Sequence, residues 1–123
     1  MADARPRPAR NHGSTPCAAP DSLADLTALA VRVLDLYATR TGIVQDDLWS
    51  LAKLAEETGE LTAAWLSAHG RGRARGLDAA ALRRAVEDEA ADLLGFVLHF
   101  AHRNDIDLGA ALVRKWGAHL PDA

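Results

Sequence analysis

Apolar residues between about positions 22 and 119 recur every three to four residues, in four segments separated by short breaks rich in Gly, Asn and Asp. This is the spacing of an amphipathic α-helix, which advances about 100° per residue. No segment alternates apolar and polar residues as a strand does, and no internal repeat stands out. The sequence therefore predicts an all-α fold with helices over about 21–39, 46–68, 78–103 and 107–119.

The chain's 123 residues are expected to form one domain, over 21–120, preceded by a disordered tail over 1–20. The tail is rich in Pro, Ala and Arg and lacks the apolar region of a secretory signal. No segment approaches the roughly 20 apolar residues of a membrane span. Cys17 is the single cysteine and allows no intramolecular disulfide. We expect a cytoplasmic protein that binds no membrane. A net charge of −3 with no basic face also disfavours nucleic acid.

Acidic residues cluster on the second and third predicted helices. Residues i, i+3 and i+4 of a helix lie on one side, so two such helices packed face to face gather their carboxylates in one cleft. Hard cations such as Mg²⁺ and Mn²⁺ prefer oxygen ligands. The candidate metal ligands are Glu56, Glu57, Glu60, Glu89 and Asp92.

Glu89 argues most strongly for a site. A helical projection places it inside the apolar stripe of its helix, with Asp92 at the edge of that stripe. A carboxylate that faces a core is destabilising unless it is paired or bound to metal. The alternative is that the acids form a solvated helix face without a metal-binding role, and the position of Glu89 makes this alternative less favourable.

The second predicted helix has an apolar stripe from Leu48 through Leu51 and Leu54 to Trp65, which we expect to face the core. Its acids lie on the opposite face, among alanines and Gly59. Small residues there leave room for ions and a ligand.

Together these motifs resemble a known enzyme family. EExxE at 56–60, ExxD at 89–92 and IDLGAALVRK at 106–115 are similar, in order and spacing, to the all-α nucleoside triphosphate pyrophosphohydrolases of the MazG type. The resemblance covers about 34–115. It implies a four-helix MazG-like bundle completed by homo-oligomerisation. It also implies a Mg²⁺-dependent enzyme, with Mn²⁺ as a substitute, that cleaves nucleoside triphosphates between the α and β phosphates in a housecleaning role.

The resemblance also implies roles for residues. The five acids become metal-binding and catalytic, and Lys115 becomes a phosphate ligand, although a lysine that closes a helix also complements the helix dipole. Among the acids we assign Glu57 as the general base, because Glu56 and Glu60 stack as a chelating pair. His119 stands where the family pattern has an asparagine, which puts the identity of the substrate in question.

Other residues have two interpretations each. Lys53 can pair with Glu57 or touch substrate, and Trp49 can stack on a base or simply pack. His99 can contact substrate or form an interior hydrogen bond. The arginine-rich loop over 70–76 can close over phosphates or be a solvated surface loop.

Three functions stay open: the nucleoside triphosphate pyrophosphohydrolase, a phosphoribosyl-ATP pyrophosphohydrolase, and a non-catalytic helical module with a metal-stabilised dimer core. In each case we expect a homodimer or a dimer of dimers. The apolar stripes are too broad for one small subunit to cover.

Overall fold

A computed structural model of the chain describes residues 22–122. Within that range the secondary structure is helical throughout and contains no strand, which confirms the all-α prediction. The predicted tail over 1–20, including Cys17, lies outside the described residues. The elements are α1 (Leu23–Thr41), α2 (Asp47–Ala68), α3 (Ala79–Arg103), α4 (Leu108–Trp116) and a 3₁₀ turn, η1 (Gly117–His119).

Local chemistry sets the helix boundaries. Each α-helix begins after a polar side chain that accepts a hydrogen bond of 2.8–3.1 Å from the backbone N–H three residues later. Gly42 ends α1 in the left-handed conformation, at φ 70°. The capping residues are Ser22, Asp46, Asp78 and Asp107.

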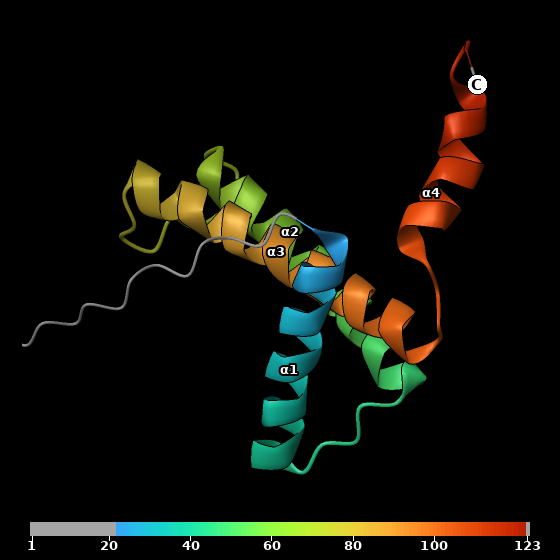
Figure 1. Cartoon of the computed structure of the whole chain (residues 1–123). Coiled ribbons are helices and arrows are strands. Elements are labelled where there is room, and N and C mark those ends of the chain that lie inside the picture. Colours follow the sequence, from blue (N-terminus) through green and yellow to red (C-terminus); the bar gives the residue numbers. More distant parts are fainter. Residues whose placement is uncertain (1–21, 123) are drawn as a thin grey trace, which may run out of the picture.

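Helices α2 and α3 run antiparallel, side by side, and α1 crosses α3 (Figure 1). Helix α4 projects away from this three-helix body, and its main contacts within the described chain are with η1 (Figure 1). The three longer helices therefore form the framework of the protein, and α4 is an arm attached to it.

The interior is small and unusually polar. Among the described residues, the buried apolar side chains are Leu98 and Ala101. The buried polar side chains are Ser50 and Glu57 of α2 and His99 of α3. The seam between α2 and α3 is where these helices bring their polar groups together.

The prediction that the leucine stripe of α2 packs in the core of the chain is wrong. Leu48 is 75% exposed and Trp65 is 50% exposed. The opposite face of α2, with Ser50 and Glu57, packs against α3 instead. Leu54 and Leu61 of the stripe are half-buried, whereas Leu48, Leu51 and Trp65 are exposed, as are the small residues Ala52, Gly59 and Ala63.

Between residues 22 and 122, no helix combines the length and the apolar character that a membrane crossing requires.

Candidate metal centre

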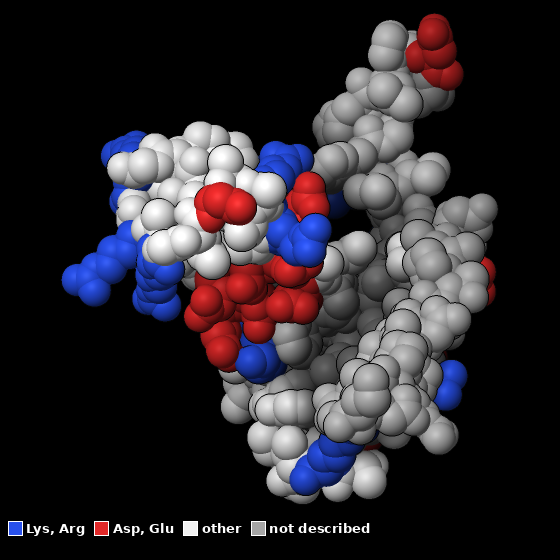
Figure 2. Space-filling view, turned by 90° about the vertical axis from the view of Figure 1, so that its left-hand side faces the viewer, with Lys and Arg blue, Asp and Glu red and all other residues white. Residues whose placement is uncertain are grey.

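Three carboxylates from two helices meet at the α2–α3 seam. One oxygen from each of Glu57, Glu89 and Asp92 lies within 4.8 Å of the others. Glu57 is buried, Glu89 is half-buried and Asp92 is exposed, so the acidic cluster is anchored in the interior and opens to solvent. Figure 2 shows acidic side chains gathered into one patch, with basic side chains at its border. A set of three oxygen donors at this spacing suits a hard divalent cation.

The cluster is electrostatically unfavourable when no cation is present. Burial raises the pKa of Glu89, and the neighbouring charges of Asp92, Glu57 and Glu60 raise it further. Each of these effects disfavours the ionised carboxylate. A divalent cation would favour it, so the donor set fits the metal that the sequence predicts.

Lys53 lies next to the cluster and neutralises part of its charge. Its Nζ is 2.8 Å from a carboxylate oxygen of Glu56 and 3.7 Å from one of Glu57. The hydrogen bond with Glu56 raises the pKa of Lys53, and burial partly opposes that rise. The ammonium also lies 5.5 Å from the centre of the Phe96 ring. Lys53 therefore links the acids to an aromatic surface.

The other two predicted acids lie at the edge of the cluster. The side chain of Glu56 is 55% exposed and points to Lys53. Glu60 is exposed and borders a cavity that it shares with Glu89. The structure thus brings Glu57, Glu89 and Asp92 together, with Glu60 nearby and Glu56 engaged by the lysine.

Trp49 and His99 lie further along the α2–α3 seam, beyond Lys53 and Phe96. The Trp49 ring makes edge contacts with Phe96, at 5.6 Å between centroids, and with His99, at 6.4 Å. His99 is only 4% exposed, and its Nδ1 lies 3.2 Å from the hydroxyl oxygen of Ser50. Burial lowers the pKa of His99, which favours the neutral imidazole. The structure therefore places His99 in the interior.

Sequence reasoning did not single out Ser50, which is fully buried. A signal was present, because Ser50 lies one turn before Lys53 and two turns before Glu57, on the face of α2 that carries the site. A hydroxyl on that face is expected to need a polar partner on the facing helix.

Lys115 is exposed on α4. It borders a groove that α4 forms with Leu94 and Leu98 of α3. That groove contains none of the clustered carboxylates, so within one chain Lys115 is not part of the acidic site.

No family model matches the chain, and neither the curated proteins nor the solved structures include one that is similar to it. Its function is therefore inferred from the site itself.

Proposed function

We propose that the protein is a metal-dependent nucleoside triphosphate pyrophosphohydrolase of the MazG type, which removes surplus or non-canonical nucleotides. The observation that carries this proposal is the meeting of Glu57, Glu89 and Asp92 within 4.8 Å, across two helices. Mg²⁺ is the proposed cofactor and Mn²⁺ its substitute, held by these three carboxylates with Glu60 beside them.

The reaction is a hydrolysis at the α phosphorus. Water oxygen forms a bond to this phosphorus, and the bond to the bridging oxygen of the β phosphate breaks, so that pyrophosphate leaves with the electron pair. A bound cation neutralises phosphate oxygens and lowers the pKa of water. Glu57 accepts the proton of the attacking water, because it is buried at the cluster. Its carboxylate oxygen lies 3.7 Å from Nζ of Lys53, so the lysine engages it less closely than it engages Glu56. Lys53 holds Glu56 away from the reacting water.

A substrate panel tests the function. Purified protein is incubated with each common and modified deoxynucleoside triphosphate and with phosphoribosyl-ATP, in Mg²⁺ or Mn²⁺, and released pyrophosphate is measured. Turnover of the triphosphates supports the proposal, and turnover of phosphoribosyl-ATP alone assigns the second candidate activity. Metal binding without any turnover assigns the non-catalytic module.

Metal binding is expected to stabilise the fold. A ligand that binds only the folded chain adds about 2.7 kcal/mol at 100 times its Kd. Mn²⁺ should therefore raise the melting temperature of the wild-type protein, and Glu89→Gln should abolish the rise. Glu87→Gln is the matched control, because Glu87 lies on the same helix but is exposed and pairs with Arg83 at 3.1 Å. An equal shift in all three proteins would place the metal elsewhere.

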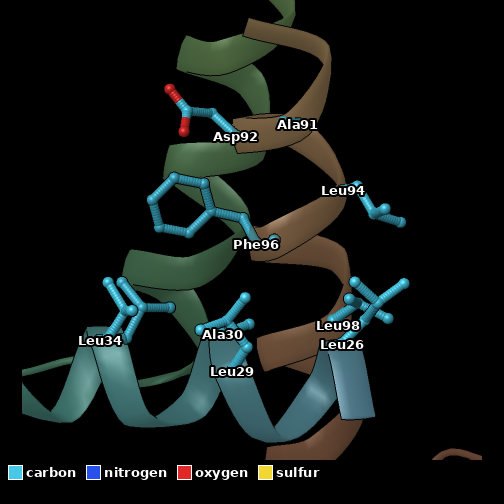
Figure 3. Close-up of a pocket in the computed structure, with 11 residues that line it drawn as sticks. Leu26, Leu29, Ala30, Leu34, Ala91, Asp92, Leu94, Phe96 and Leu98 are labelled. Carbon is cyan, nitrogen blue, oxygen red and sulfur yellow. The ribbon is translucent and has the colours of Figure 1, made fainter. Parts of the chain in front are cut away.

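We also propose that the protein acts as a homodimer whose interface is an apolar groove. One cavity of about 290 Å³ lies between α1 and α3 (Figure 3). An adjoining cavity of about 390 Å³ lies between α3 and α4, and the two share Leu94 and Leu98. The ridges beside them are exposed and apolar, for example Leu29 at 51%, Leu112 at 54% and Trp116 at 66%. Apolar surface of this extent marks an interaction site.

A second copy of this chain is the occupant that fits. The remaining residues of the chain, 1–21 and 123, contain no Leu, Ile, Val, Phe, Tyr or Trp with which to cover the groove. The charged residues that border the groove are Asp92, in the cavity between α1 and α3, and Lys115, in the cavity between α3 and α4. In the proposed dimer, a two-fold axis near the shared Leu94 and Leu98 sets the α1–α3 cavity of one copy on the α3–α4 cavity of the other.

Charging the groove is expected to separate the subunits. Burying one leucine contributes about 1.5–3 kcal/mol to the free energy of association. A two-fold dimer contains each interface residue twice, so Leu112→Glu should raise the dimer Kd at least about 100-fold. Analytical ultracentrifugation over a concentration series measures this. Val44→Glu is the control, because Val44 is 76% exposed and lies outside the groove.

Two results would contradict the assignment of this interface. One is a wild-type protein that remains monomeric at micromolar concentration. The other is a dimer that survives Leu112→Glu but dissociates with Leu51→Glu, which would move the interface to the exposed stripe of α2. Circular dichroism confirms that each variant is folded.

A further inference from the structure

A cavity of about 380 Å³ lies at the end of the seam, where the loop between α2 and α3 folds back over the two helices. Alanines on both helices form part of its wall, which leaves space that larger side chains would fill. Its bordering residues include Glu60, Ala63, Ala64, Arg73, Arg75 and Glu89.

Opposite charges border this cavity without neutralising each other. Glu60 and Glu89 come from the helices, whereas Arg73 and Arg75 come from the loop. In the described part of the chain, neither guanidinium is within ion-pair distance of a carboxylate. Residues of both charges therefore line the cavity, with the acids on the helices and the arginines on the loop. A ligand that carries both a cation and phosphate groups matches this arrangement.

The loop that carries the arginines is held in place by its backbone. The N–H of Arg71 donates to the carbonyl oxygen of Leu66 at 2.8 Å, and the N–H of Leu77 donates to that of Ala74 at 3.0 Å. Gly72 packs directly on Ser67, since a Cβ at Gly72 would lie 3.0 Å from the hydroxyl oxygen of Ser67. These contacts fix the loop against the end of α2, so that the arginines border the cavity before any ligand binds.

Glu89 connects this cavity to the metal centre, because it borders the cavity and is also one of the three clustered carboxylates. We propose that Arg73 and Arg75 bind the β and γ phosphates of the substrate, the part that leaves as pyrophosphate. This inference rests on the proposed function. Guanidinium groups donate paired hydrogen bonds to phosphate oxygens and keep their charge at any working pH.

With its β and γ phosphates at these arginines, the substrate lies along the seam in a defined direction. The α phosphate lies at the carboxylate cluster, between the arginine cavity and the aromatic surface of Phe96 and Trp49. The step from Glu89 to Phe96 along α3 is about 10 Å, at about 1.5 Å per residue. The nucleoside therefore extends toward Lys53 and the aromatic rings, and the phosphate chain extends toward the loop.

Pyrophosphate binding tests the inference without turnover. Isothermal titration calorimetry with inorganic pyrophosphate and Mg²⁺ is compared for the wild type, an Arg73→Gln/Arg75→Gln double variant and Arg71→Gln. We expect about 10-fold weaker binding for each cavity arginine that is lost, and about 100-fold for both. Arg71 belongs to the same loop but does not border the cavity, so Arg71→Gln should bind as the wild type does. Mn²⁺ binding should be the same in all three proteins.

The outcomes separate this inference from the proposed function. Triphosphate turnover with equal pyrophosphate affinity in all three proteins would overturn the arginine site and leave the function standing. A second outcome is that the wild type does not turn over triphosphates, yet only the double variant loses pyrophosphate binding. This result would support the arginine site and contradict the proposed function. Equal weakening by Arg71→Gln would show a diffuse charge effect and overturn the assignment.

Discussion

Glu57→Gln is expected to lower pyrophosphate release from the preferred triphosphate by about 100- to 10,000-fold at saturating Mg²⁺, the range typical of a lost general base. The amide is nearly the same size as the carboxylate but cannot accept the proton of the attacking water. It also offers the cation a neutral oxygen in place of a charged one. Because Glu57 is buried at the seam, solvent cannot easily take over its role.

Two further variants make this result specific. Glu56→Gln should have a smaller effect, since Glu56 is half-exposed and is engaged by Lys53 at 2.8 Å. Glu87→Gln should leave turnover unchanged, because that carboxylate pairs with Arg83 on the surface of α3. Normal turnover by Glu57→Gln would remove Glu57 from the mechanism. Equal losses in Glu56→Gln and Glu57→Gln would mean that the structure does not distinguish the two acids.

The stability of the folded chain is expected to decrease as pH falls below about 6.5, because of His99. Burial lowers the pKa of His99 in the folded protein; the nearby charges of Arg103 and His102 lower it further, while Asp35 and Asp47 partly oppose them. Below about pH 6.5 the unfolded chain therefore binds a proton that the folded chain does not. The free energy of unfolding falls by up to about 1.4 kcal/mol per pH unit until the lowered pKa is reached.

Urea unfolding over about three pH units around the ordinary histidine pKa, from about pH 4.5 to about pH 7.5, measures this dependence. His99→Gln should flatten the curve near pH 6, and it should also reduce stability because Ser50 loses its partner at 3.2 Å. His102→Gln is the control, because His102 lies on the same helix and is exposed. If His102→Gln flattened the curve and His99→Gln did not, the assignment to the buried histidine would be wrong.

Local patterns were sufficient to predict the helices. Each start depends on one capping side chain, such as Asp46 or Asp78, and the end of α1 depends on Gly42. These interactions span only a few residues, so they can be identified in the sequence without knowledge of the fold. The placement of acids at helical spacing on α2 and α3 was predictable for the same reason.

Packing between helices was not predictable from those patterns. The apolar stripe of α2 through Leu48 and Trp65 suggested a buried face, but that face is exposed in the folded chain. Which side of a helix is buried depends on the shape and charge of its partner. Here α3 packs on the side of α2 that carries Ser50 and Glu57, so only Leu54 and Leu61 of the stripe become half-buried.

The sequence by itself determined that the chain is helical, where its four helices begin, and which carboxylates are available as oxygen ligands. Only the tertiary structure decided that Glu57, Glu89 and Asp92 meet, while Glu56 turns to Lys53. It also decided that Arg73 and Arg75, but not Arg71, border the cavity beside them. The physical reason is that helix formation depends on neighbours along the chain, whereas a site depends on how separate segments pack in space.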